Sequence, residues 1–144
     1  MAVQTNNFIA LDVGDRRIGI AVAAKEAGFA SPLTTLIRSE AIFDDLQQLL
    51  AEQHASILIV GLPRGLEGQE TAQTTAVRGF VEELRAHISI PVEWQDEALT
   101  SKQAEAELEA RGKKFQREDI DSLAATYILE DYLAANRQRS SHAV

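Results

Sequence analysis

The stretch FIALDVGDRRIGIAVAA, residues 8–24, determines how the fold begins. Residues 8–13 and 18–24 are apolar runs of the length that predicts buried strands, and the four residues between them are typical of a tight turn. Two strands joined so closely should form an antiparallel hairpin. Asp12 interrupts the first run at a position where a core residue belongs. A carboxylate placed there needs a partner, and a divalent cation is one that several carboxylates can share.

The rest of the chain alternates helices and strands. Pro32 in the next extended stretch favours a strand at the edge of a sheet, and Pro91 ends a helix whose apolar positions run from Ala76 to Ile88. Residues 57–60 predict a short central strand, and residues 61–63 predict the turn after it. The expected elements are strands 8–13, 18–24, 30–37, 57–60 and 92–94, with helices at 41–53, around 76–88, from Thr100 to Gly112, and from about 119 to 136.

This order, three strands followed by helix, strand, helix, strand and two helices, predicts an α/β fold. Right-handed crossovers would place the last two strands parallel to the first, beside a three-stranded antiparallel meander. The result is a mixed five-stranded sheet with helices on both faces, which is the ribonuclease H-like arrangement. Ligands of such sheets gather near the carboxyl ends of the strands.

Length and composition set limits on the class of protein. A chain of 144 residues with 45% hydrophobic content predicts one domain, residues 1–138, followed by a disordered tail at 139–144. The absence of cysteine excludes a zinc-thiolate site and suits the cytoplasm. Charged residues interrupt the longest apolar stretch, so we expect neither a leader peptide nor contact with a membrane.

The formal net charge of -8 argues against tight binding of nucleic acid by a monomer. The basic residues, however, cluster in or beside predicted loops, where they are candidates for contacts with phosphate groups. Ordinary solvated surface charge is an equally good interpretation of any one of them. The candidates are Arg16, Arg17, Arg64, Lys102, Lys113, Lys114 and Arg117.

A helical wheel of the last helix separates its acids. At about 100° per residue, Asp121 falls inside the apolar arc, whereas Asp119 falls on the polar side with Ser122 and Thr126. Asp131 also falls on the apolar side. It lies ten residues after Asp121, roughly 15 Å along the axis, so we expect that it cannot share a metal site with Asp121.

Each acid taken alone has an ordinary structural explanation. Asp12 can belong to a turn that continues with Gly14, and the pair Asp96-Glu97 can favour the start of a helix near Thr100. Together with Asp121, however, these acids come from distant segments and fall at the same predicted edge of the sheet. Their joint placement indicates metal-dependent hydrolysis of phosphodiesters.

Four blocks of this sequence resemble those of the YqgF/RuvX family. They are LDVGDRRIGIAVA from Leu11, ILIVGLPRGLEGQE from Ile57, DEALTS from Asp96 and DIDSLAATYILEDYL from Asp119. Members of the family are described as Holliday junction resolvases or as nucleases that mature the 5′ end of pre-16S ribosomal RNA. The resemblance implies structured RNA or branched DNA as the partner and places the catalytic, metal-binding acids at Asp12, Glu97 and Asp121.

With these acids, the expected chemistry is two-ion hydrolysis with Mg²⁺ or Mn²⁺, because all the predicted ligands are oxygen atoms. Asp12 would share both ions, which lie roughly 3.5–4 Å apart in such sites. The chain departs from the family at Ala98, where an arginine is usual and Lys102 is a possible substitute. It departs also at Asp15 and at Arg64-Gly65, and these differences bear on the choice of substrate.

Two other classes of protein fit part of the pattern. An Asp-x-Gly hairpin also opens the phosphate loops of actin-like ATPases and sugar kinases, but those proteins pair two such domains around the nucleotide. A nucleic-acid-binding module that has lost its chemistry is the second alternative, and the presence of all three acids argues against it. The resolvase reading further predicts a homodimer, because two symmetric cuts need two active sites.

Overall fold

The structure, a computed structural model, describes residues 6–26, 28–97, 106, 109–110 and 117–142. Its strands are β1 (Asn7–Val13), β2 (Arg17–Ala24), β3 (Ser31–Ile37), β4 (Ala55–Pro63) and β5 (Val92–Glu97). The helices are α1 (Ile42–Glu52), α2 (Ala72–Arg85) and α4 (Arg117–His142). Residues 98–105 and 111–116, which contain most of the expected third helix, lie outside the described residues.

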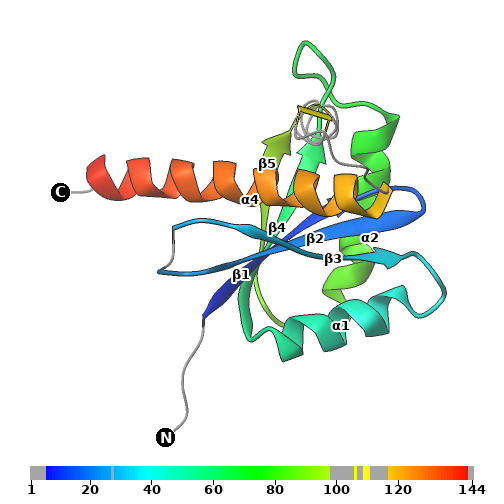
Figure 1. The fold of residues 1–144 in the computed structure, drawn as a ribbon. Helices are drawn as coiled ribbons and strands as arrows, with labels where there is room; N and C mark the ends of the chain where they lie inside the picture. Colours follow the sequence, from blue (N-terminus) through cyan, green and yellow to red (C-terminus); the bar gives the residue numbers. More distant parts are fainter. Residues whose placement is uncertain (1–5, 27, 98–105, 107–108, 111–116, 143–144) are drawn as a thin grey trace, which may run out of the picture.

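The strands form one mixed sheet in the order β3-β2-β1-β4-β5 (Figure 1). β1 pairs antiparallel with β2, and β2 pairs antiparallel with β3, which gives the expected meander. β4 lies parallel to β1, and β5 lies parallel to β4. This topology confirms the predicted α/β fold, with Pro32 on the edge strand β3.

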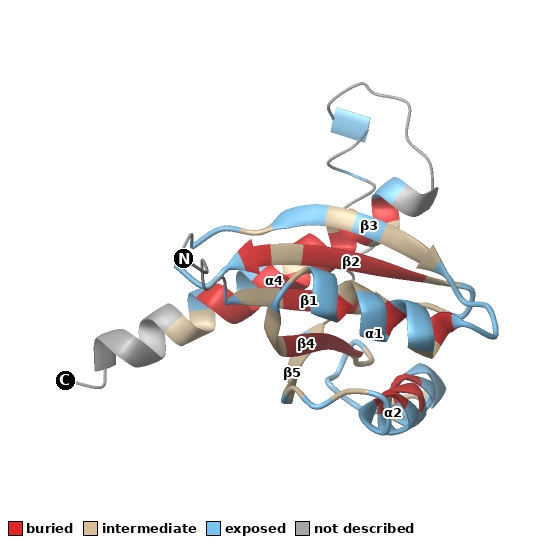
Figure 2. Ribbon diagram, turned by 90° about the horizontal axis from the view of Figure 1, so that it is seen from below, coloured by how far each residue is buried: buried red, intermediate tan, exposed pale blue. Residues whose placement is uncertain are grey.

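Helices lie on both sides of the sheet (Figure 2), and alternate residues of β1, β2 and β4 face opposite layers of them. Ile9 and Leu11 of β1 pack with α1 and α2, whereas Ala10 between them packs with α4. The α4 side of the sheet carries small side chains, Ala21 and Ala23 among them, so this helix can approach the strands closely. The helices therefore cover both faces, as predicted.

Two strands are longer than predicted. Residues 61–63, expected as a turn, are the last residues of β4, and β5 continues past Trp94 to Glu97. The physical reason is mutual pairing: Leu62 is in register with Asp96, and Pro63 is in register with Glu97. Parallel partners extend each other beyond the point at which the apolar run ends.

Two helix ends also differ from the expected ones. α2 ends at Arg85, so Ile88 lies beyond it, partly buried against the core. α4 continues to His142, past the expected end near Asn136. Among the described residues, no helix combines the length and the apolarity that crossing a membrane requires.

The polar face of α4 was predicted correctly for Asp119 and Glu130, which are exposed, but not for other residues. Ser122 and Thr126 are buried, whereas Asp131, placed on the apolar side, is exposed. Burial of the two hydroxyl groups is tolerated because each donates to a carbonyl of its own helix, Ser122 Oγ to Asp119 O at 3.4 Å and Thr126 Oγ1 to Ser122 O at 2.8 Å. A wheel built from polarity alone therefore assigned both residues to the wrong side.

Candidate active site

Asp12 lies near the carboxyl end of the central strand β1 and pairs across the hairpin with Gly19. Two residues from Ala10, it faces the α4 side of the sheet. The carboxyl group is largely removed from water, and this burial, together with the charge of nearby Asp121, raises its pKa to about 6. The aspartate thus lies in surroundings that disfavour its negative charge.

Gly19 explains how Asp121 comes so close to Asp12. A Cβ atom at Gly19 would overlap the backbone carbonyl of Asp121 and touch the nitrogen of Ser122. The first turns of α4 therefore rest directly on the backbone of β2, which only a glycine permits. Because Gly19 is the pairing partner of Asp12, this contact brings Asp121 next to Asp12.

Asp121 forms an ion pair with Arg17, the first residue of β2. The distance from Arg17 Nε to Asp121 Oδ2 is 2.7 Å, and the two side chains are 25% and 18% exposed. The bond is short and largely shielded from water, so it is stronger than an exposed pair. No local sequence pattern predicts this pairing, because the partners are 104 residues apart.

Glu97 reaches the same region from the end of β5. Its Cγ lies 3.6 Å from the point that a Cβ of Gly61 would occupy, so the side chain lies over the open backbone of β4. Its Oε1 atom is buried and has no hydrogen-bond partner among the described residues. Burial, a hydrogen bond with Asp131, and the charges of Asp131, Asp12 and Asp96 raise the pKa of Glu97 to about 8.

The contact between Asp131 and Glu97 was not predicted, and its origin is the direction of α4. The helix passes Gly19 on β2 at Asp121 and Gly61 on β4 at Ile128. The ten residues from Asp121 to Asp131 span about 15 Å, close to the roughly 14 Å between β2 and β5, three strand spacings apart. The helix thus places an acid over each end of the site.

These carboxylates suit a hard divalent cation in their chemistry. All are oxygen donors, and the buried Oε1 of Glu97 has no hydrogen-bond partner among the described residues. Positive charge would offset the burial and the repulsion that raise the pKa of Asp12 and of Glu97. Within the part of the chain that the structure describes, no three acidic, histidine or cysteine side chains lie close enough together to hold a metal ion. Asp121 is paired with Arg17, and β4 lies between β1, which carries Asp12, and β5, which carries Glu97.

The predicted basic contacts have different surroundings. Arg64 lies 3.3 Å from Asp96 and 3.6 Å from Glu70, and its backbone nitrogen donates to Glu97 O, so it braces the end of β5. Arg16 is exposed at the β1–β2 turn. Lys102, Lys113 and Lys114 lie outside the described residues, as does Ala98; of Arg117, only its place at the start of α4 is described.

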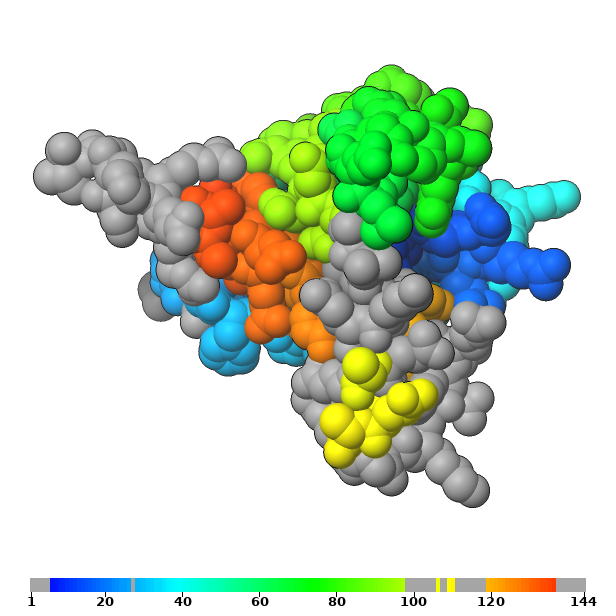
Figure 3. All heavy atoms as spheres, turned by 90° about the horizontal axis from the view of Figure 1, so that it is seen from above, coloured from blue at the N-terminus to red at the C-terminus, as the bar shows by residue number. Residues whose placement is uncertain are grey.

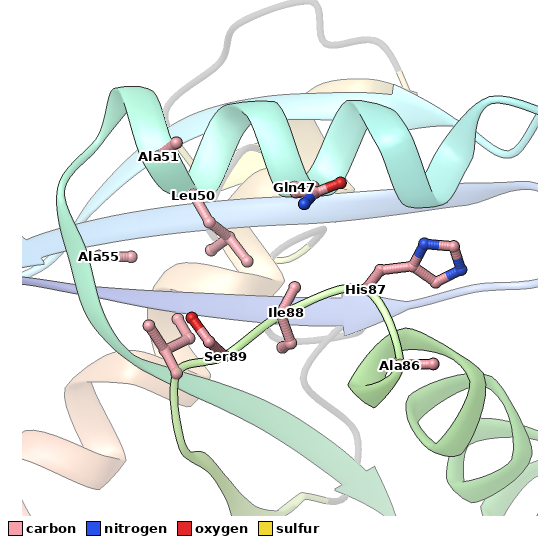
Figure 4. Close-up of a pocket in the computed structure, with 9 residues that line it drawn as sticks. Gln47, Leu50, Ala51, Ala55, Ala86, His87, Ile88 and Ser89 are labelled. Atoms are coloured by element: carbon pink, nitrogen blue, oxygen red, sulfur yellow. The ribbon is translucent and has the colours of Figure 1, made fainter.

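The acids share one edge of the sheet, away from the pockets of the α1 and α2 layer. Figure 3 looks onto this edge, with the green segment after β4, the blue β1–β2 turn and the orange α4 in view. A hollow of about 440 Å³ lies elsewhere, between the end of α1 and the segment after α2 (Figure 4). It is lined by Leu50, Ala55, His87 and Ile88 at the opposite ends of the parallel strands, and none of the acids contributes to it.

Comparison with known proteins identifies the family of the chain. The sequence model of the family described as "RuvX: Holliday junction resolvase" matches residues 6–135. The chain belongs to the RuvX family. The resemblance found in the four sequence blocks is thereby confirmed.

Relatives of this RuvX protein match it over nearly their whole length. A protein of Chloroflexus aggregans named "Putative pre-16S rRNA nuclease" is 42% identical over 134 residues, covering 90% of this chain and 94% of that protein. A protein of Sulfurihydrogenibium with the same name is 37% identical over 130 residues, covering 89% and 90%. T. thermophilus RuvC in complex with a Holliday junction substrate has a TM-score of 0.58 at 19% identity, covering 92% of this chain and 96% of RuvC. That similarity shows the shared ribonuclease H-like fold.

Proposed function

We propose that this RuvX protein is a metal-dependent nuclease that trims the 5′ end of pre-16S ribosomal RNA. The observation that carries the proposal is the placement of Asp12, Glu97 and Asp121, from three separate elements, at one edge of the sheet in a chain of this family. The chain covers 94% and 90% of the length of two relatives whose names refer to pre-16S rRNA. These names support the ribosomal substrate.

The three acids are the proposed ligands of Mg²⁺ or Mn²⁺, in a two-ion arrangement. Divalent ions in such a site supply positive charge that activates water and stabilises the leaving oxygen of a phosphodiester. Asp12 has the central place, because the charge of Asp121 acts on Asp12, and the charge of Asp12 in turn acts on Glu97. The buried Oε1 of Glu97 is a free acceptor for this purpose among the described residues.

The negative net charge requires the substrate to be held by a limited number of cations. Arg16 beside the site is the candidate with a described, exposed position. The proposed set of phosphate contacts is completed by Lys102, Lys113 and Lys114, between β5 and α4 in the sequence, and by Arg117 at the start of α4. Arg64 has a different proposed task, that of bracing the strand that carries Glu97.

The second candidate function is resolution of Holliday junctions, which the description of the matching family favours. Cutting two strands symmetrically requires two active sites, so this activity would need a homodimer. The same three acids would perform the hydrolysis in either case. The two functions differ in substrate and in oligomeric state, and both differences are measurable.

A cleavage assay with parallel substrates tests the proposal. The full chain is incubated with an RNA that carries the pre-16S 5′ leader, a four-way DNA junction and an unstructured RNA, each with Mg²⁺, Mn²⁺ or EDTA. We expect cleavage of the leader that EDTA stops and that Asp12→Asn lowers more than 100-fold. Preferred cutting of the junction by a dimer would support the resolvase function instead. Binding without any cleavage would support the non-catalytic module.

A further inference from the structure

Asp121 is ion-paired with a positively charged side chain, Arg17, that lies at the acidic site. Arg17 occupies an odd-numbered position of β2 with Gly19 and Ala21, and therefore faces α4 and the three acids. Its ion pair with Asp121 is shorter and less exposed than the Arg64–Asp96 pair, which measures 3.3 Å with an aspartate that is 69% exposed.

A divalent cation has to compete with this guanidinium. Arg17 Nε already occupies Oδ2 of Asp121 at 2.7 Å, so an ion that took that oxygen would displace or crowd the arginine. The two positive charges would also repel each other across a partly buried site, where charges interact more strongly than in water. In the free protein, Arg17 should therefore weaken the binding of metal.

A displaced guanidinium at this position would face the substrate. Arginine binds phosphate oxygens through two parallel hydrogen bonds, and Arg17 leads out of the turn in which Arg16 is exposed. A nucleic-acid phosphate at the site would thus offer Arg17 a replacement for Asp121. Each binding event would remove an obstacle to the other.

We propose that Arg17 is a positioning residue that changes partners. It holds Asp121 in the free protein and a phosphate of the nucleic acid once a divalent ion has taken Asp121, so that metal and substrate bind cooperatively. The inference rests on the proposed function and adds a condition to it. Without substrate, Arg17 keeps the affinity of the site for the divalent ion low.

The first test measures binding of Mn²⁺ alone to the full chain by titration calorimetry. Arg17→Gln removes the competing charge, and Arg17→Lys keeps a charge without the forked geometry. Lys25→Gln is the matched control, because Lys25 is exposed just beyond the opposite end of β2 and its loss changes the net charge equally. We expect Arg17→Gln to bind Mn²⁺ about fivefold tighter or more, with Lys25→Gln close to wild type.

The second test measures the coupling itself. Binding of a fluorescent RNA with a phosphorothioate backbone, which resists cleavage, is followed by anisotropy with and without Mn²⁺. We expect Mn²⁺ to tighten RNA binding about fivefold or more in the wild type, and this gain to fall toward onefold in Arg17→Gln. Circular dichroism spectra and melting curves establish that each variant is folded.

Equal or weaker Mn²⁺ binding by a folded Arg17→Gln would overturn the proposal, as would undiminished coupling. If Arg17→Gln fails to fold, the same criterion applies to Arg17→Lys. Its Mn²⁺ binding should then be tighter than that of the wild type. Failure of the proposed function has a different signature. In that case Asp12→Asn would leave both Mn²⁺ binding and cleavage unchanged, whatever the Arg17 variants did.

Discussion

The Glu97 carboxyl should make the stability of the metal-free protein depend on pH. Its pKa is about 8 in the folded protein, against an ordinary value of 4.5, so between these limits the folded state binds a proton that the unfolded state lacks. Stability therefore falls as the pH rises from about 4.5 to about 8. Glu97→Gln, which cannot ionise, should flatten this fall.

Urea unfolding in EDTA at pH 5 and pH 8 measures the effect. Glu93→Gln is the control, since it makes the same change on the same strand. We expect the loss of unfolding free energy between the two pH values to be smaller in Glu97→Gln than in either the wild type or Glu93→Gln. Identical losses in all three proteins would show that Glu97 ionises normally.

At the level of single residues, sequence and structure contributed different parts of the site. Asp12, Glu97 and Asp121 were identified from interrupted apolar patterns and from the resemblance, and their catalytic role stays a prediction. The partners of these acids could not be found in this way. The pairing of Arg17 with Asp121 and of Asp131 with Glu97 depends on the direction in which α4 crosses the strands, which no local pattern encodes.

The packing of α4 on β2 depends on one glycine. Gly19→Ala would place a methyl group against the Asp121 carbonyl, so either the helix or the strand must shift. We expect a loss of about 1–3 kcal/mol in unfolding free energy, together with a loss of cleavage, because Asp121 would move away from Asp12.

Gly79→Ala is the matched control for that substitution. Gly79 lies inside α2 with open space around its Cα, so the same change should stabilise the protein by about 0.5–1 kcal/mol through helix propensity. Chemical denaturation of both variants gives the comparison. A Gly19→Ala protein as stable and as active as the wild type would show that α4 does not need this close contact.

At the level of elements, the strands and helices followed from apolar periodicity, whereas several of their ends did not. β4 and β5 extend each other through pairing between residues that are more than thirty positions apart. The buried face of α4 differed from the wheel because Ser122 and Thr126 satisfy their hydroxyl groups within the helix. The first difference arises from a tertiary contact between strands, and the second from local hydrogen bonds that allow polar side chains to be buried.

For the whole molecule, binding of a divalent ion should raise stability. An ion that binds only the folded protein contributes about 2.7 kcal/mol at a hundred times its dissociation constant. Saturating Mn²⁺ should therefore raise the melting temperature of the wild type by several degrees, and the effect should be lost in Asp12→Asn. Differential scanning calorimetry in Mn²⁺ and in EDTA provides the measurement; equal shifts in both proteins would place the bound ion elsewhere.

Two aspartates in one helix give the most direct test of the three-acid site. Asp121→Asn and Asp119→Asn make the same change two residues apart in α4, but Asp121 faces Asp12 whereas Asp119 is exposed. The measurement is the single-turnover rate of Mn²⁺-dependent cleavage of the preferred substrate. We expect a loss of more than about 100-fold for Asp121→Asn and a nearly unchanged rate for Asp119→Asn. Equal rates in the two folded variants would contradict the three-acid site.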